Sequence, residues 1–422
     1  MLLDLHTDYH YIIYLIQFFP VFLVISIAVL ILLILFLPVK GAGSFRYDPP
    51  SERFHEADTV LSRRLLIPGS EAYERYYREN PHLKKTDDHS RDSPGLLSGS
   101  SKYFQTETFA VSRANFGIID HLGLLTHDSP KDLLLNREGN KLRTSLKVDP
   151  VKASRFITRW LKQSGAHRVG FTALKDYHLY SHKGRGIRSG NPIPYEHSNA
   201  IAITVEMDYA MMQPAPLGTS VMESSEQYLR SGILALKLAS YIRELGYEAT
   251  AHIDGNYEVI CPLVAVDAGL GVIGRMGLLM TPVLGSRVRI SVVTTDMPVA
   301  YSHSIPDRTT LHFCHLCRKC AVNCPAAAIP EGSRETIDGT KRWLINSEKC
   351  YHFWTVSGTD CGRCITVCPY SHRDDVFHRF IRWGIKNNLV FRYLAVKLDD
   401  VFYGQKPPVR PLPDWADMIE KP

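Results

Sequence analysis

The first part of the chain lacks charge. No charged residue occurs between Ile12 and Leu37, and no lysine or arginine precedes Lys40. An uncharged apolar run of this length can cross a bilayer with some tilt. A cleaved signal peptide would have a basic start, a shorter core and a small-residue cleavage site, and no twin arginine precedes the run. We therefore predict a retained transmembrane anchor over residues 1–40.

Basic residues are missing before the apolar run but present after it. Lys40, Arg46 and Arg53 follow Leu37 closely. The positive-inside rule then places the rest of the chain in the cytoplasm, where thiols stay reduced. We predict a single-pass membrane protein that contacts the lipid bilayer and has its catalytic domain facing the cytoplasm.

The chain also lacks a strongly basic block. Its formal net charge is only +6, so the sequence predicts no nucleic-acid partner. With 45% hydrophobic and 22% charged residues, its composition is that of an ordinary globular protein.

Cysteine is concentrated near the C-terminus, with eight of nine residues in two runs. The first run has the bacterial ferredoxin spacing C-x2-C-x2-C-x3-C-P and consists of Cys314, Cys317, Cys320 and Cys324. The second run has a wider first spacing and consists of Cys350, Cys361, Cys364 and Cys368. Zinc sites favour two spaced pairs, so this pattern indicates two [4Fe-4S] clusters.

In two-cluster ferredoxins the fourth cysteine of each run binds the other cluster. This crossover assigns one cluster to Cys314, Cys317, Cys320 and Cys368. It assigns the other to Cys324, Cys350, Cys361 and Cys364. We expect residues 351–360 to form a loop that separates Cys350 from its partners.

Helix and strand patterns alternate through the middle of the chain. Residues 151–165 and 225–245 predict helices, and residues 169–173, 200–205 and 287–294 predict strands. The alternation predicts an α/β (α+β) architecture. Residues 39–110 have an irregular composition, which predicts a linker.

A glycine-rich segment fits G-x-G-x-x-G at Gly269, Gly271 and Gly274. The dinucleotide fingerprint requires a strand before the motif and a helix after it. Here residues 262–268 read as a helix, and a short stretch with glycine and proline follows. We therefore expect a glycine loop that approaches another large cofactor.

The glycine segment 268–282 with its continuation, Arg287-Val-Arg-Ile and Thr295-Asp-Met-Pro, resembles the corrinoid-dependent reductive dehalogenases when combined with the cysteine runs. Epoxyqueuosine reductases share a similar segment and cluster arrangement. Three further pieces are similar to dehalogenase motifs: Tyr180–Arg185, Glu206–Tyr209 and Tyr241–Tyr247.

The resemblance implies a nitroreductase-like core with base-off cobalamin and a ferredoxin-type module with two [4Fe-4S] clusters. It also implies an organohalide substrate, with a halogenated aromatic or phenol as the first expectation. The cofactor-binding residues expected from the glycine segment are Gly269, Gly271, Gly274, Arg275, Gly277 and Thr281. The predicted domains are an anchor (1–40), a linker and wrapping segment (41–148), a corrinoid-binding catalytic core (149–307), a cluster module (308–375) and a C-terminal extension (376–422).

Some members of the family have a twin-arginine leader, and others have a fused flavin and ferredoxin reductase. Neither is expected here, so we predict a separate electron donor, either a ferredoxin or flavodoxin reductase or a donor in the membrane.

The resemblance places the proton donor at Tyr228, with Tyr209, expected at the end of a strand, as the competitor. A neighbouring cation would stabilise the phenolate. Arg289 is the preferred cation, with Arg287 and Arg275 as alternatives. Asn256 matches a family asparagine in the pocket.

Two other functions fit parts of this pattern. An epoxyqueuosine-type reductase acting on tRNA would need a basic face and an acid, often aspartate, where Tyr228 stands. A membrane ferredoxin that only transfers electrons would not need the large domain before its clusters. Cobalt content separates the ferredoxin from the two corrinoid enzymes.

Overall fold

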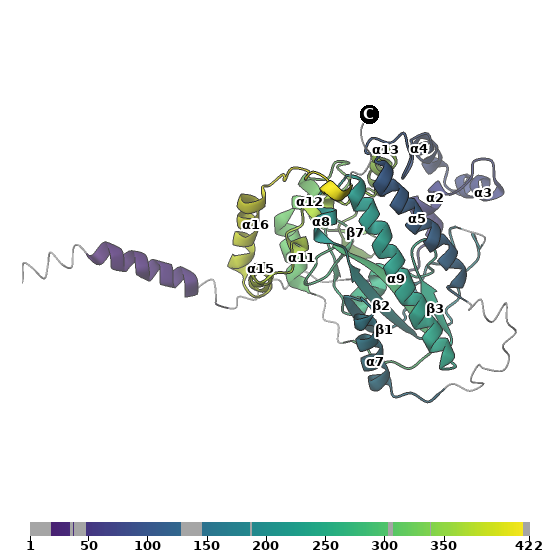
Figure 1. Ribbon diagram of the computed structural model, residues 1–422, viewed down its shortest axis with the longest axis horizontal. Helices are drawn as coiled ribbons and strands as arrows, with labels where there is room; N and C mark the ends of the chain where they lie inside the picture. Colours follow the sequence, from purple (N-terminus) through teal and green to yellow (C-terminus); the bar gives the residue numbers. More distant parts are fainter. Residues whose placement is uncertain are drawn as a thin grey trace, which may run out of the picture.

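The computed structural model describes residues 18–33, 37, 48–127, 146–185, 188–302, 307–337 and 339–416. Figure 1 shows a central sheet with helices packed on it, the cluster-bearing segment beside the sheet, and an N-terminal helix that stands apart from this body.

The central sheet has four strands in the order β1-β2-β6-β3, and every neighbouring pair is antiparallel. The strands are β1 (Arg168–Ala173), β2 (Asn199–Glu206), β3 (Ala249–His252) and β6 (Val288–Thr295). The three predicted strands are confirmed. The α/β alternative, which implies parallel neighbours, is wrong, because alternation along the chain does not fix strand direction; the core is α+β.

Strand β2 is buried on both faces, which explains its continuous apolar sequence. Ile201, Ile203 and Val205 pack in one core, under helices α7 (Pro150–Gln163) and α9 (Gly218–Glu244). The intervening Ala200 and Ala202 pack in a second core with helix α10 (Cys261–Asp267). Successive strand side chains point to opposite faces, so the sheet is sandwiched between two layers.

The two predicted helices are also confirmed. Asp149 caps α7, because its carboxylate accepts hydrogen bonds from the backbone N–H groups of Val151 and Lys152. Helix α9 begins at Gly218, earlier than predicted, and ends at Glu244.

The glycine segment follows α10 and contains a hairpin of β4 (Val272–Ile273) and β5 (Leu279–Met280). No helix opens at its glycines, so it is not a dinucleotide fingerprint, as its context indicated.

The prediction of an irregular linker over residues 39–110 is wrong for much of that range. It contains η1 (Glu56–Asp58), α2 (Val60–Arg64), α3 (Glu71–Glu79), α4 (Pro81–Arg91) and the start of α5 (Thr106–Leu122). Helices α2, α3 and α4 are short, and α3 and α4 are polar on average. In α3 the buried face consists of two tyrosines one turn apart, Tyr73 and Tyr77, and not of aliphatic residues.

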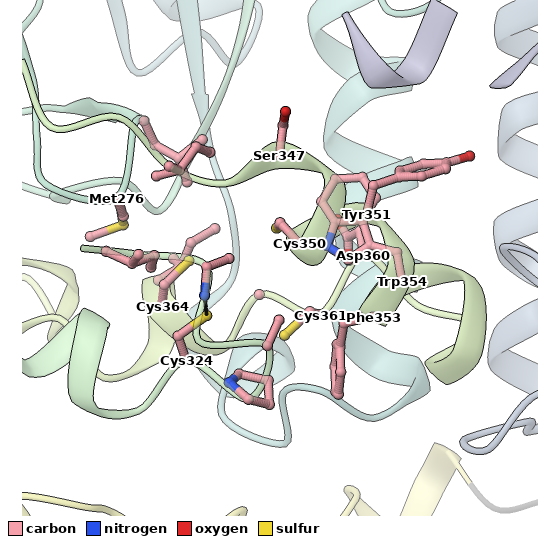
Figure 2. Close-up of a pocket in the computed structure, with 18 of the residues that line it drawn as sticks. Met276, Cys324, Ser347, Cys350, Tyr351, Phe353, Trp354, Asp360, Cys361 and Cys364 are labelled. Atoms are coloured by element: carbon pink, nitrogen blue, oxygen red, sulfur yellow. Dashed lines mark hydrogen bonds between the residues drawn. The ribbon is translucent and has the colours of Figure 1, made fainter. Parts of the chain in front are cut away.

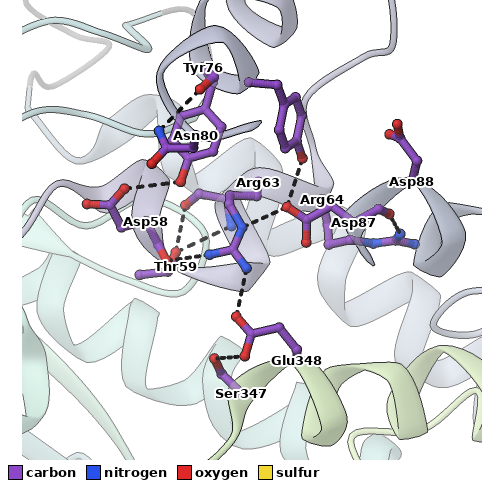
Figure 3. Close-up of polar contacts among 12 residues, drawn as sticks. Asp58, Thr59, Arg63, Arg64, Tyr76, Asn80, Asp87, Asp88, Ser347 and Glu348 are labelled. Carbon is purple, nitrogen blue, oxygen red and sulfur yellow. Dashed lines mark hydrogen bonds and ion pairs between the residues drawn. The ribbon is translucent and has the colours of Figure 1, made fainter. Parts of the chain in front are cut away.

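A buried ionic network fastens these helices to the cluster-bearing segment (Figure 3). Arg63 Nε lies 2.8 Å from Asp87 Oδ2 of α4, and its Nη2 lies 2.9 Å from Glu348 Oε1 at the start of α13 (Ser347–Ser357). Tyr77 also donates a hydrogen bond to Asp87. Burial alone would lower the pKa of Arg63, but its hydrogen bonds to the two carboxylates raise it.

This network predicts a large loss of stability when one partner is removed. Asp87→Ala leaves the buried Arg63 guanidinium with only the partly exposed Glu348 as an ion-pair partner, a change that should cost up to about 3–5 kcal/mol. Asp92→Ala, at an exposed position directly after α4, should stay within about 0.5 kcal/mol. Anaerobic thermal unfolding at one scan rate should show a clearly lower midpoint temperature for Asp87→Ala than for the wild type, and an unchanged midpoint for Asp92→Ala. Equal midpoints for the wild type and Asp87→Ala would contradict a stabilising role for the network.

The cysteine runs lie on short helices next to the sheet. They are α11 (Arg308–Cys317), α12 (Lys319–Val322), α13 and α14 (Arg363–Thr366), with the small hairpin of β7 (Glu335–Ile337) and β8 (Thr340–Arg342) between them. The predicted loop over 351–360 is wrong in its first part, since α13 continues to Ser357. Helices α15 (Val376–Asn387) and α16 (Leu389–Tyr403) follow.

The predicted anchor is described only in part. Residues 18–33 form a helix whose side chains are all exposed, and residues 12–17 and 34–36 lie outside the described residues. In the part of the chain that is described, no helix has both the length and the apolar character needed to cross a membrane.

Candidate functional site

A mostly apolar cavity of about 260 Å³ brings the predicted cluster and catalytic residues together. Four cysteines line it: Cys324, Cys350, Cys361 and Cys364. Figure 2 shows these four thiols around one space. Tyr228 and Arg289 line the same cavity.

The thiols form two groups. Burial raises the pKa of Cys368, and the neighbouring Cys314, Cys317 and Cys320 raise it further. Likewise, burial and then Cys361, Cys350 and Cys324 raise the pKa of Cys364. The last cysteine of each run therefore lies among the cysteines of the other run, an arrangement that agrees with the crossover assignment.

The cluster thiols are buried or half-buried. Burial raises the pKa of Cys317 to about 12 and that of Cys350 to about 11. Thiolate ligands in such surroundings need the positive charge of bound iron. Among the described residues, no three His, Cys, Asp or Glu side chains are placed to hold a single metal ion. A cubane does not require such a group, because each thiolate binds a different iron.

Tyr228 and Arg289 are direct neighbours. The Arg289 guanidinium carbon lies 4.6 Å from the centre of the Tyr228 ring. Tyr228 comes from α9 and Arg289 from β6, which pack against each other. Burial raises the pKa of Tyr228, while Arg289 lowers it. The hydroxyl is therefore protonated at neutral pH, and a cation stands beside the phenolate that proton transfer would leave.

Asp360 and Ser224 hold Arg289 from the other side. Arg289 Nη2 lies 2.9 Å from Asp360 Oδ2 and also donates to Ser224 Oγ, and Ser224 donates to the same carboxylate oxygen. Neither residue was predicted from the sequence. Ser224 is one helical turn before Tyr228 on α9, so their shared face could have been inferred. Asp360 gave no signal except that it precedes Cys361.

Two polar atoms of this group are not satisfied by the protein. Arg289 Nε and Asp360 Oδ1 are buried and have no hydrogen-bond partner among the described residues. Buried polar atoms normally have partners, so unpaired atoms in a cavity wall indicate a place where a bound molecule makes contact.

The alternatives to Arg289 and Tyr228 make their contacts in other parts of the protein. Arg287 binds Glu206 at 2.8 Å and also the carbonyls of Met207 and Ser371, whereas Arg275 donates to four backbone carbonyls, those of Cys314, His315, Pro330 and Gly332. Tyr209 begins the short helix α8 (Tyr209–Met212), so its predicted place at the end of a strand is wrong. It does not line the cavity that contains Tyr228.

Asn256 is also placed outside that cavity. Its amide nitrogen donates to the Gly123 carbonyl at 2.5 Å and to Thr126 Oγ1 at 3.0 Å. These contacts fasten the turn after β3 to the end of α5. Asp254, two residues earlier, lies close enough to Tyr228 to raise its pKa. Burial and Arg289 have larger effects on that pKa.

The glycine segment contributes to a second cavity of about 330 Å³, which Gly274 and Gly277 line with Tyr180 and Trp343. Ile345 lines both cavities, so they adjoin. The other predicted cofactor residues do not line either cavity and make contacts within the protein. An added Cβ at Gly271 would lie 2.2 Å from the Met280 carbonyl oxygen. Thr281 Oγ1 donates to the Gly285 carbonyl, Arg275 is fully buried, and Gly269 has a φ of +74° after α10.

The fold and the site define a class of redox protein. In this class a two-cluster ferredoxin module is joined to an antiparallel core, and a tyrosine of the core lies beside the cysteines of one cluster. Residues 313–372 match the family described as "4Fe-4S dicluster domain", which confirms the predicted pair of clusters. The chain is 29% identical over 298 residues to a tetrachloroethene reductive dehalogenase of Sulfurospirillum multivorans, covering 61% of this chain and 58% of that protein.

A second tetrachloroethene reductive dehalogenase, from Desulfitobacterium hafniense, is 32% identical over 232 residues, covering 51% of this chain and 40% of that one. A catabolic reductive dehalogenase solved with 3-bromo-4-hydroxybenzoic acid has the same fold, with a TM-score of 0.65, 21% identity, and coverage of 87% of this chain and 50% of that one. The chain is thus similar to the reductive dehalogenases, as its motifs predicted. It spans about half the length of these relatives.

Proposed function

We propose that the protein is a membrane-anchored reductive dehalogenase that uses a corrinoid and two [4Fe-4S] clusters. The single observation that supports this most strongly is the Tyr228–Arg289 pair in a cavity lined by four cluster cysteines. A protein that only transfers electrons has no use for a buried acid and cation with unsatisfied atoms beside its cluster.

The proposed reaction replaces halogen by hydrogen. The carbon–halogen bond breaks, a carbon–hydrogen bond forms, and halide leaves; two electrons and one proton are consumed. The corrinoid, when bound, supplies the low-potential centre at which the carbon–halogen bond is cleaved. Tyr228 donates the proton, and Arg289 stabilises the phenolate that remains.

The second cavity, together with the end of the first cavity at Tyr228 and Arg289, is the proposed place of the corrinoid, because the space among the four cysteines of the first cavity is the place of their cluster. The walls of the two cavities fit the corrinoid in two ways: the lining is mostly apolar, and Arg289 Nε and Asp360 Oδ1 offer unpaired polar atoms. Gly274 and Gly277 would contact it, and the other glycines of the segment would support that loop.

The cluster of Cys324, Cys350, Cys361 and Cys364 is the proposed immediate electron source, since its cysteines share the cavity with Tyr228. The cluster of the other four cysteines would receive electrons first, from a separate donor. The anchor over residues 1–40 would hold the catalytic domain at the cytoplasmic face of the membrane.

The substrate is proposed to be an organohalide. A halogenated phenol is the first candidate, because the Arg289 guanidinium could stabilise a bound phenolate. A chlorinated alkene is the second, because the curated relatives are named tetrachloroethene reductive dehalogenases. Measuring the turnover rates of a halogenated phenol and of a chlorinated alkene with one preparation would show which class is the substrate.

Cofactor analysis tests the proposal directly. Anaerobically reconstituted protein should contain about eight irons and about one cobalt per chain, since each cubane has four irons. Halide release should depend on both metals. A preparation with full iron that dehalogenates without corrinoid would refute the corrinoid, and one that binds no corrinoid would favour the electron-transfer alternative.

A further inference from the structure

The helical hairpin formed by α15 and α16 exposes an apolar stripe on the face opposite its packed face. On α16, the apolar side chains at residues 390, 394, 398 and 401 are exposed, and Val401 is 78% exposed. The same helix buries Arg392 and Asp399. A helix on the surface of a soluble domain normally buries its apolar stripe and exposes its charges.

The exposed residues of α16 follow one another at helical spacing, so they form a stripe rather than scattered positions. Val390, Leu394, Leu398 and Val401 recur every three or four residues, with Lys397 beside them. On α15, Val376, Phe380 and Trp383 form a similar exposed stripe. A contiguous exposed apolar surface of this kind marks an interaction site.

The composition of the hairpin suits a lipid surface. Phe380 and Trp383 stack with ring centres 5.9 Å apart, and Tyr393 is also exposed. Residues 373–410 contain eight lysines and arginines, of which Arg382 and Arg392 are buried, against four aspartates and no glutamate. Aromatic and apolar side chains combined with basic ones are typical of helices that lie in the membrane interface.

Leu37 of the N-terminal segment contacts this hairpin. Asn388, which lies between α15 and α16, donates from its side-chain nitrogen to the Leu37 carbonyl at 2.6 Å. Its side-chain oxygen caps α16 by accepting from the Phe391 N–H. Leu37, whose N–H donates to the Leu33 carbonyl at the end of the exposed apolar helix of residues 18–33, therefore lies at the hairpin, and Figure 1 shows α15 and α16 at the end of the body nearest that helix.

We propose that the α15–α16 hairpin lies in the interfacial layer of the lipid bilayer, as a second membrane contact beside the N-terminal anchor. The proposal uses the anchor of the proposed function and adds a surface to it. Ile385 and Ala395 of the hairpin pack in one core with Cys314, Cys320 and Cys368. The membrane contact therefore places the cluster of Cys314, Cys317, Cys320 and Cys368 on the membrane side of the molecule, where electrons from a membrane donor would enter.

Tryptophan fluorescence can test this in the full chain, because residues 1–40 contain no tryptophan and the anchor is silent. The protein is reconstituted in vesicles of phosphatidylcholine and phosphatidylglycerol, with or without bromine on the acyl chains. Bromine near the headgroups should quench more emission than bromine at the bilayer centre. The ratio of tryptophan emission in brominated vesicles to emission in unbrominated vesicles removes the quenching caused by the iron–sulfur clusters, because the clusters quench equally in both.

Two variants assign the signal. Trp383→Phe should abolish most of the lipid-dependent quenching, and Trp415→Phe should leave it unchanged. Trp415 is the matched control because it is 63% exposed but lies in η5 (Asp414–Ala416), which is hydrogen-bonded to Gln105 at the start of α5. Leu398→Glu with Val401→Glu should reduce quenching of Trp383, whereas Ile67→Glu, at an exposed apolar position on another part of the surface, should not.

The outcomes separate the hairpin from the anchor. If the protein floats with vesicles but Trp383 is not quenched, the anchor stands and the hairpin proposal is refuted. If it does not float, both are refuted. Vesicle-bound protein that cross-links as a dimer through α16, again without quenching, would assign the stripe to a second copy of the chain.

Discussion

Tyr228→Phe should reduce kcat by about 10²- to 10⁴-fold, the usual contribution of a general acid, while iron and cobalt contents stay unchanged. The substitution removes only the hydroxyl and keeps the ring against which Arg289 lies, with its guanidinium carbon 4.6 Å from the ring centre. Since burial keeps the hydroxyl protonated, the wild-type rate should not fall through neutral pH, and any loss from Tyr228 ionisation should begin only above the ordinary tyrosine pKa.

Tyr209→Phe is the matched control for this measurement. Tyr209 stands on α8 beside Arg287, whose guanidinium carbon is 5.7 Å from its ring, and it does not line the Tyr228 cavity. Its loss should change turnover little. A dead Tyr209→Phe beside an active Tyr228→Phe would assign the proton to Tyr209. Two active variants would mean that neither tyrosine donates it.

Arg289→Gln should lower kcat by a similar factor. The double variant with Tyr228→Phe should be little worse than either single variant, because residues that act as a unit have non-additive effects. Multiplicative losses would show that Arg289 acts on the substrate independently of the tyrosine.

The strands and the two long helices could be predicted because their patterns are local. Residues 200–205 are apolar and β-branched in the manner of a strand buried on both faces, and Asp149-Pro150 is a helix start with an evident cap. The direction of the strands could not be predicted, since antiparallel pairing of β2 with β6 joins residues about ninety positions apart and depends on which helices cover each face.

The candidate site was predictable where chemistry requires a spacing and unpredictable where it requires only proximity. Cubane binding fixes the cysteine intervals, so the ligands could be read from the chain. Asp360 reaches Arg289 because the segment after α13 turns back across the start of α9, and nothing in the local sequence indicates that approach. The role of Asn256 stays a prediction, because its side chain is hydrogen-bonded to Gly123 and Thr126 and does not line the cavity that contains Tyr228.

Removing Cys368 should destroy the cluster farther from Tyr228, although Cys368 belongs to the run that supplies three ligands to the nearer one. Its side chain lies among Cys314, Cys317 and Cys320. Cys368→Ser should therefore lower the iron content from about eight towards about four, or leave a three-iron cluster, and turnover should fall to background because electrons no longer reach the site. Cys324→Ser should have the same effect on iron through the other cluster.

Pairs of substitutions distinguish crossover from assignment by run. Under crossover, Cys317→Ser combined with Cys368→Ser removes two ligands of one cluster, so the second substitution should cost no further iron. Cys317→Ser combined with Cys324→Ser damages both clusters, and the iron content should fall towards zero. Assignment by run reverses both expectations, because Cys317 and Cys324 would then share a cluster and Cys368 would belong to the other. Iron analysis with EPR of the reduced variants reads the difference without any need for turnover, so the result holds whatever the substrate is.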